Sequence, residues 1–297
     1  MQGKRIVIAG GSGLVGSKLQ DLLESRGHQV AVLTRSPSGK RHFFWDPSKK
    51  RIDLPELAET QILINLSGAG IADERWTAKR KRLLRDSRVG TNEFLLSLTD
   101  QMPELEQFIS ASGINAYGYD HPSKVYSETD PYGHDYLSTL VKDWEKSALG
   151  FESVCKVAVV RTAIVLDAHD GALKRLMPMV KIGAGSPIGT GKQMMPWIHI
   201  DDLCRIYLHI IEKGLDGTYN AVTDQCSNKE FLWVLTRVLK RAFYLPNVPA
   251  IILRAMFGQM ASMLLNGLKA SNEKIRSTGF TFTHPTLEGA FRDLFKR

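Results

Sequence analysis

The sequence predicts an α/β protein: a Rossmann-type, doubly wound parallel sheet followed by a smaller, mainly helical C-terminal lobe. Three observations predict this fold. Strand and helix patterns alternate along the first two-thirds of the chain, a glycine-rich turn joins the first strand to the first helix, and few strand patterns follow residue 222. We therefore expect a nucleotide-binding domain over residues 1–222, in which 166–198 contribute to a substrate pocket, and a C-terminal lobe over 223–297.

The spacing of apolar residues indicates the individual elements. Short apolar runs, several rich in β-branched residues, predict strands at 5–9, 29–34, 61–66, 108–111 and 157–166. Apolar residues at helical spacing predict helices at 17–26, 87–98, 136–149, 201–214, 228–243, 249–268 and 272–279. Strands that alternate with helices form parallel sheets with right-handed crossovers.

The composition is that of an ordinary globular protein. Of 297 residues 43% are hydrophobic and 24% charged, and the net charge is +8. The basic runs 79–82 and 240–241 have helix-like surroundings, which indicates solvated helix faces, so we expect no nucleic-acid partner. The first apolar run, 6–9, is short and followed by glycines, which indicates a strand and not a signal peptide.

The cysteines and the most apolar stretch indicate the cellular compartment and whether the chain contacts a membrane. The three cysteines are odd in number and form no Cys-x-x-Cys pair, which disfavours a disulfide framework or a zinc site and fits a reducing cytoplasm. The stretch 250–268 contains Arg254, Gln259 and Asn266, so we expect an amphipathic helix and no membrane partner.

The strongest local motif runs from Gly10 to Gly16, between the first strand and the first helix. Gly10 permits the tight turn, Gly13 lets the backbone approach a pyrophosphate, and Gly16 allows close helix–strand packing. The free N–H groups and the positive dipole of the helix N-terminus suit phosphates. We assign the remaining expected contacts of this turn to Ser12, Leu14 and Val15.

The end of the second predicted strand indicates which dinucleotide binds. Enzymes that use NAD usually place an Asp or Glu there to bind the ribose 2′-hydroxyl. This chain has Thr34, Arg35 and Ser36 instead, and Arg35 can pair with a 2′-phosphate while Ser36 donates a hydrogen bond. Lys40 and Arg41 add positive charge nearby. The sequence therefore favours NADP(H), although an Arg35 that only stacks on adenine would suit either cofactor.

Other strand ends complete the expected cofactor site. Ligands of such sheets lie beyond the carboxyl ends of the strands, so the residues that follow the 61–66 strand should border the dinucleotide. The residues assigned to this part of the cofactor site are Leu66, Ser67, Gly68, Ala111 and Thr162.

Several motifs together resemble the extended short-chain dehydrogenase/reductase superfamily. Besides the glycine turn, the segment 87–91 (Ser-Arg-Val-Gly-Thr) is similar to its Asn-x-x-Gly-Thr helix signature, and 196–203 is similar to its Phe-Ile-His-Val-Asp-Asp motif. With the 183–191 loop and Gly-Phe-Thr-Phe at 279–282, the chain looks like a narrower group, described as nucleotide-sugar epimerases with a C-terminal domain of unknown function. The resemblance implies hydride transfer with a nicotinamide cofactor and, by analogy, a homodimer.

The catalytic residues that the resemblance implies are only partly present. The superfamily uses a Ser that polarises the substrate oxygen and a Tyr whose pKa is lowered by a Lys four positions later. Ser112 fits the first role, whereas none of the eight tyrosines has a Lys four positions on. Leu137 and Val141 occupy the two expected places. Tyr136 and Tyr117 are the alternative proton-transfer candidates.

Two further groups of residues have the chemistry of substrate or metal ligands. Lys192 and Gln193 follow the 183–191 loop, which by resemblance borders the substrate, so both are candidate substrate contacts; a purely structural turn is the alternative. His199 and Asp201 have the residue types of a metal pair, but no third ligand stands near them in the sequence. We therefore interpret them as structural hydrogen-bonding residues and expect no metal.

Two functional hypotheses follow. The first is an NADP(H)-dependent oxidoreductase or epimerase that acts on a small hydroxyl- or carbonyl-bearing substrate of unknown identity, with a nucleotide sugar suggested by resemblance alone. The second is a catalytically degenerate NADPH-binding regulatory or interaction protein, because the cofactor motif is intact while the Tyr/Lys pair is missing.

Overall fold

The core of the protein is an eight-stranded sheet with the order β11-β8-β6-β5-β1-β2-β3-β4. The computed structural model describes residues 3–296 except 54, 56 and 122. All neighbouring strands of this sheet run parallel except β3 and β4. The strands are β1 (Arg5–Ala9), β2 (Gln29–Thr34), β3 (His42–Asp46), β4 (Arg51–Ile52), β5 (Ile62–Asn65), β6 (Gln107–Gly113), β8 (Lys156–Thr162) and β11 (Gly217–Ala221).

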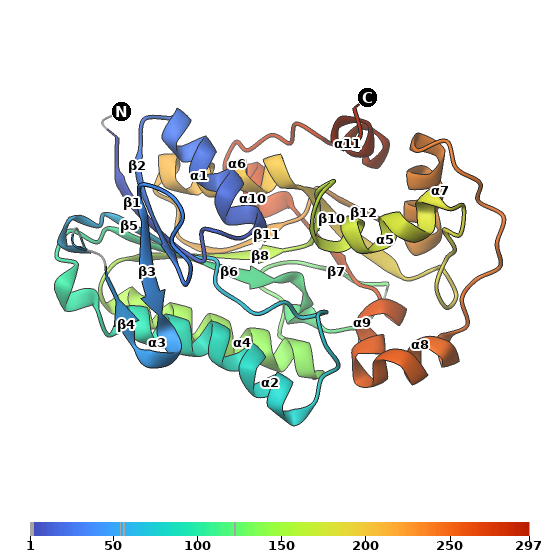
Figure 1. The fold of residues 1–297 in the computed structure, drawn as a ribbon, viewed down its shortest axis with the longest axis horizontal. Coiled ribbons are helices and arrows are strands. Elements are labelled where there is room, and N and C mark those ends of the chain that lie inside the picture. The colour runs from blue at the N-terminus through green and yellow to red at the C-terminus, as the bar shows by residue number, and fades with distance from the viewer. Residues whose placement is uncertain (1–2, 54, 56, 122, 297) are drawn as a thin grey trace.

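Helices cover both faces of this sheet, as the alternation of strands and helices predicts (Figure 1). Alternate residues of β1 serve the two faces: Ile6 and Ile8 pack in one hydrophobic core, and Val7 and Ala9 in the other. The helices of the first face are α1 (Leu14–Ser25), α6 (Ile200–Lys213) and α10 (Glu273–Ser277). Those of the second are α2 (Ala78–Arg85), α3 (Thr91–Leu96) and α4 (Tyr136–Leu149).

The strand order reverses beside β1, which pairs with β2 on one side and β5 on the other. Connections leave in opposite directions at such a point, and doubly wound sheets bind their ligands there, beyond the carboxyl ends of the two central strands. The residues that follow β1, β2 and β5 are therefore the ones that this topology places at a ligand site.

A second, three-stranded sheet has the order β12-β10-β9, and it carries its own hydrophobic core. Trp197 and Phe231 are fully buried in this core, and Phe231 meets Phe291 edge-on with ring centroids 5.2 Å apart. The elements around this core are β9 (Ile164–Leu166), β10 (Met194–His199), β12 (Asp224–Ser227), α5 (Gly171–Lys181), α7 (Asn228–Val238) and α11 (Leu287–Leu294).

The chain after α7 returns to the core around the main sheet. Helices α8 (Ala250–Phe257) and α9 (Ala261–Leu265) lead to β13 (Lys269–Ala270), which pairs with β7 (Val125–Tyr126). Ile275 and Phe280 are then buried in the same core as β1 and α6. No described helix is long and apolar enough to cross a membrane.

Two predicted elements are each divided in the structure, because the backbone leaves the regular conformation within them. The predicted strand 157–166 is two strands, since the N–H of Ala163 bonds to Ala221 and the chain then joins β10 in the other sheet. The predicted helix 249–268 is likewise divided, at Gly258, whose φ is 57°. A positive φ cannot continue a right-handed helix.

Several other bounds differ. Helix α1 begins at Leu14 and not at residue 17, and α7 ends before Lys240, which has a φ of 54°. The predicted helix 87–98 begins with a π-turn (Asp86–Gly90) before α3. The strand β10 and the helix α11 were not predicted, because each short apolar pattern there fits more than one element.

Phe291→Ala should lower the free energy of unfolding by about 3–5 kcal/mol, because a fully buried aromatic ring that joins α11 to α7 is lost. Denaturant unfolding followed by circular dichroism measures this change. The matched control is Arg292→Ala on the same helix, whose side chain is 69% exposed and should change stability by less than about 1 kcal/mol. Equal effects of the two changes would contradict the packing described for α11.

Candidate functional site

The glycine turn lies between β1 and α1, and two of its glycines are required by packing. Gly10 has a φ of 75°, and a Cβ there would lie 2.9 Å from the backbone N of Ser67. A Cβ on Gly16 would lie 2.4 Å from the Cα of Gly11, so only glycine allows α1 to start this close to the turn. The tight turn expected at Gly10 is present, whereas the close approach at Gly16 is to Gly11 of the turn and not to a strand.

Gly13 differs from these two because its surroundings are open. It is the N-cap of α1 and is exposed, and the one neighbour that a Cβ would meet is the carbonyl oxygen of Gly10 at 3.4 Å. No side chain caps α1, and its first turn, which contains Leu14 and Val15, holds no acidic residue. The N–H groups of this turn are therefore available to an anion, which the helix dipole favours.

The end of β2 presents a basic, hydroxyl-bearing edge beside this turn. Thr34 is buried, and its hydroxyl lies 3.0 Å from that of Ser12 and accepts the N–H of Ser36 at 3.3 Å. Arg35 and Ser36 are exposed, and within the described chain Arg35 forms no ion pair. Arg41 is engaged elsewhere, since its Nε donates to the carbonyl of Val30 at 2.9 Å.

The end of β5 is held by residues of the 87–91 motif and its neighbour. The side-chain amide of Asn65 donates to Thr91 at 3.2 Å and to Asn92 at 2.7 Å. Its carbonyl oxygen accepts the N–H of Ser67 at 3.0 Å, while the N–H of Leu66 bonds to Ala9. These bonds fix the chain where it leaves the sheet, next to the glycine turn.

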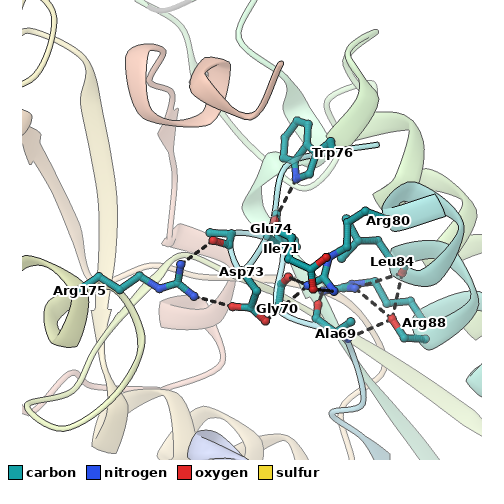
Figure 2. Close-up of polar contacts among 12 residues, drawn as sticks. Ala69, Gly70, Ile71, Asp73, Glu74, Trp76, Arg80, Leu84, Arg88 and Arg175 are labelled. Atoms are coloured by element: carbon teal, nitrogen blue, oxygen red, sulfur yellow. Dashed lines mark hydrogen bonds and ion pairs between the residues drawn. The ribbon is translucent and has the colours of Figure 1, made fainter. Parts of the chain in front are cut away.

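Residues 66–76 continue from this point as a loop, and arginines hold its carbonyl groups (Figure 2). Arg88 donates to the carbonyl of Ala69 at 3.0 Å, and Arg80 to that of Gly70 at 2.6 Å. From the opposite side, Arg175 of α5 reaches the carbonyl of Ala72 and the carboxylate of Asp73, both at 2.5 Å. Loop 66–76 thus bridges the main sheet and α5.

A buried ion pair joins α4 to β8 and β6. The carboxylate of Glu145 accepts from Arg161 Nε at 2.8 Å and from Nη2 at 2.7 Å, and both residues are at most 3% exposed. Two hydroxyl groups donate to the same carboxylate, that of Tyr132 at 2.6 Å and that of Ser112 at 2.5 Å, so it accepts four hydrogen bonds. A buried carboxylate with this many donors is well compensated for the loss of water.

Ser112 and Tyr117, two of the predicted catalytic residues, belong to this network. Ser112 is buried and donates its hydroxyl proton to Glu145. Tyr117 donates to Asn220 at 2.7 Å and accepts from Arg161 at 3.0 Å. Burial raises the pKa of Tyr117 to about 12, so its phenol stays protonated at neutral pH.

Tyr136, the third candidate, has different surroundings. It is the first residue of α4, its ring lies 5.1 Å from Trp76, and Lys81 Nζ lies 4.5 Å above the ring. Among the described residues its buried hydroxyl has no hydrogen-bond partner. Burial raises the pKa of Tyr136, and the positive charge of Arg88 opposes this shift.

Arg88 connects Tyr136 to loop 66–76. It is buried, and burial lowers its pKa to about 10, so the guanidinium remains charged at neutral pH. A Cβ on Gly68 would lie 3.1 Å from its Cζ, which places the guanidinium against the loop. The positive charge of Arg88 therefore acts both on loop 66–76 and, electrostatically, on the phenol of Tyr136.

The other predicted residues occupy two places. Ala111 and Thr162 lie at the carboxyl ends of β6 and β8, and Thr162 pairs with Gly113 in the register of the sheet. Lys192 is exposed. Gln193 is buried and donates to the carbonyls of Ile188 and Leu264, at 3.0 and 3.1 Å, which gives it a structural role in joining the 183–191 loop to α9.

Sequence reasoning missed the central pair Glu145 and Arg161, although one signal pointed to it. Arg161 stands alone in an apolar strand, and a buried guanidinium requires a carboxylate partner. Glu145 follows Leu137 and Val141 at intervals of four, so it lies on the same face of α4. Arg88 could not be predicted in this role, because the 87–91 motif indicates a helix and not which loop the guanidinium contacts.

Comparison with known proteins places the chain in a family. Residues 6–221 match the model of the NAD dependent epimerase/dehydratase family. The chain belongs to this family. Residues 248–294 match a second model, a domain of unknown function (DUF1731). Both matches confirm the recognised resemblance.

The relatives span nearly the full chain. The mouse epimerase family protein SDR39U1 is 33% identical, over 98% of this chain and 99% of that protein. An epimerase family protein of Mycobacterium bovis is 32% identical, over 95% and 94%. The crystal structure of human SDR39U1 (isoform 2) with NADPH matches with a TM-score of 0.88 and 30% identity, covering 98% of each chain.

Glu145→Ala should lower the free energy of unfolding by about 3–5 kcal/mol, because Arg161 is left buried without its carboxylate. The double change Glu145→Leu with Arg161→Met removes both charges and should cost less than the single change. Chemical denaturation of the three proteins measures the difference. A double variant that is less stable than Glu145→Ala would contradict the interpretation that the unpaired charge is the main cost.

Proposed function

We propose that this protein binds NADP(H) at the carboxyl edge of β1 and β2, in preference to NAD(H). One observation carries the proposal: the uncapped N-terminus of α1 and the exposed pair Arg35 and Ser36 lie at neighbouring strand ends, with no acidic residue at the end of β2. The first suits a pyrophosphate and the second a 2′-phosphate. The NADPH bound to human SDR39U1 supports this assignment.

We further propose that the protein is an oxidoreductase or epimerase for a small hydroxyl- or carbonyl-bearing substrate. When bound, the nicotinamide supplies or accepts a hydride. The chain itself must then donate or accept a proton at the substrate oxygen. Tyr136 is the residue best suited to this, because its hydroxyl is unpartnered in the described chain while Arg88 and Lys81 lie near enough to stabilise a phenolate.

Ser112 can orient the substrate oxygen if its hydroxyl turns away from Glu145. The carboxylate would keep its two bonds from Arg161 and one from Tyr132. The loss is then one hydrogen bond to a charged group, about 1.5–3 kcal/mol, which a bond to the substrate offsets. Tyr117 is less suited to proton transfer, because its hydroxyl is committed to Asn220 and Arg161.

The hydrogen bonds that Ser112 and Tyr117 already make support a second candidate function, an NADPH-binding regulatory or interaction protein. If Ser112 and Tyr117 serve only to satisfy the Glu145–Arg161 pair, the chain retains a cofactor site without a complete catalytic set. Loop 66–76, which is held from both sides by arginines, would then relay cofactor occupancy to α5. Nucleotide-dependent capture of a partner without turnover would favour this function.

Arg35→Ala should weaken NADPH binding about 10–100-fold and leave NADH binding nearly unchanged, because a charge-assisted contact to the 2′-phosphate contributes about 1.5–3 kcal/mol. Titration followed by nicotinamide fluorescence measures both affinities. Arg26→Ala, another exposed arginine at the far end of α1, is the matched control. Equal binding of NADPH and NADH by the unchanged protein would rule out the role of Arg35.

Tyr136→Phe should lower kcat/KM about 10²–10⁴-fold without changing NADPH affinity, because only the proton-transfer group is removed. The assay follows NADPH oxidation against a panel of aldehydes, ketones and nucleotide sugars. Tyr244→Phe, with 77% of its side chain exposed, is the control. Carbonyl reduction needs the protonated phenol, and the pKa of Tyr136 is raised, so the rate should stay constant through neutral pH and fall only in alkali. Undiminished turnover in Tyr136→Phe would exclude this role.

A further inference from the structure

A cluster of metal-ligating side chains lies outside the site described above, where the C-terminal segment meets the start of α6. One ligand atom from each of four residues lies within 4.8 Å of all the others. Two of the residues flank the β10–α6 junction, and the others come from the loop before α11 and from α11 itself. The members of this His–Asp cluster are His199, Asp201, His284 and Asp293.

The buried nitrogen at the centre of the His–Asp cluster is the second observation. His199 is 1% exposed, and its Nε2 has no hydrogen-bond partner among the described residues; the nearest carboxylate oxygen, of Asp293, is 3.6 Å away. Buried polar atoms are nearly always satisfied, and an orphaned one indicates a missing water or ion.

We propose that the His–Asp cluster binds one divalent transition metal ion, Zn²⁺ foremost, as a structural staple between α6 and the C-terminal segment. Two imidazoles and two carboxylates are ligands that zinc accepts in closed, four-coordinate sites. Ligand atoms of such a site lie roughly 3.4 Å apart, so some of these atoms must move together by about 1 Å. Three of the four residues are only partly buried and have room for this adjustment.

Three existing interactions compete with the metal, and each is weaker than ligation. The N–H of Asp201 caps α6 on His199 Nδ1 at 3.2 Å, and ligation through Nε2 moves the ring proton to Nδ1 and breaks that bond. A single cap stabilises a helix far less than a structural zinc stabilises its fold. Lys18 and Lys296 pair with the carboxylates, but their side chains are 48% and 77% exposed and can turn to solvent.

The surrounding structure already holds the C-terminal ligands in place. The carboxylate of Asp202, which is fully buried, accepts the N–H groups of Thr283 and His284 at 2.8 and 2.9 Å. Phe291 anchors α11 in the core of the second sheet, two residues before Asp293. The rings of His199 and His284 are stacked, with centroids 3.8 Å apart and 29° between their planes, so the His284 ring must turn for both nitrogens to face one ion. A bound metal would then add to the stability of the C-terminal segment.

The test is metal binding by the full chain purified without a polyhistidine tag. Zn²⁺ titration and elemental analysis should give one equivalent per chain, Co²⁺ should give the intense visible absorption of a tetrahedral site, and Zn²⁺ should raise Tm. His284→Ala and Asp293→Asn should each weaken Zn²⁺ binding by at least about 100-fold, since loss of even an indirect partner of a metal ligand costs about 10–100-fold.

His209→Ala is the matched control, because His209 also joins α6 to the C-terminal segment, through Thr278 at 2.8 Å, but lies outside the His–Asp cluster. This variant should bind Zn²⁺ as the unchanged protein does. Sub-stoichiometric Zn²⁺, an octahedral Co²⁺ spectrum, or equal affinity in His284→Ala and the unchanged protein would overturn the proposal. Each outcome is independent of NADPH binding.

Discussion

The buried ion pair between Glu145 and Arg161 is the interaction on which the site depends. It lies where α4 crosses β6 and β8, and it is stable there only because further hydrogen bonds satisfy its remaining atoms. Those bonds come from Ser112, Tyr117 and Tyr132, so the residues that could have done chemistry are also the ones that support the charge. The pair therefore decides which hydroxyl groups remain free.

This constraint separates the proposed cofactor half of the site from the proposed catalytic half, which departs from the superfamily pattern. The cofactor half needs only backbone geometry and two exposed residues: a glycine turn, a helix N-terminus, Arg35 and Ser36. In the catalytic half the cation near the candidate tyrosine is Arg88, which comes from another helix, and not a lysine one turn along α4. Arg88 also holds loop 66–76, so the same guanidinium serves the loop and the phenol.

Features carried by neighbouring residues could be predicted from the sequence. The bounds of β1, β2 and α4 were predicted as they are, and the glycine turn was placed between strand and helix. Features that depend on residues far apart could not. Arg161 in an apolar strand indicates a buried acidic partner but not which residue it is. His199 contacts His284 because the C-terminal segment packs against α6, which no local pattern indicates. Backbone breaks such as Gly258 were also missed, because a glycine in a helical pattern is often tolerated.

A crystal structure of the protein with NADPH would test whether the cofactor lies between Arg35 and Tyr136, because it locates the 2′-phosphate and the nicotinamide in one measurement. We expect the 2′-phosphate to contact Arg35 and Ser36, and the nicotinamide to lie on the side of loop 66–76 that faces the hydroxyl of Tyr136. A 2′-phosphate that points into solvent away from Arg35, or a nicotinamide separated from Tyr136 by the loop, would contradict this placement.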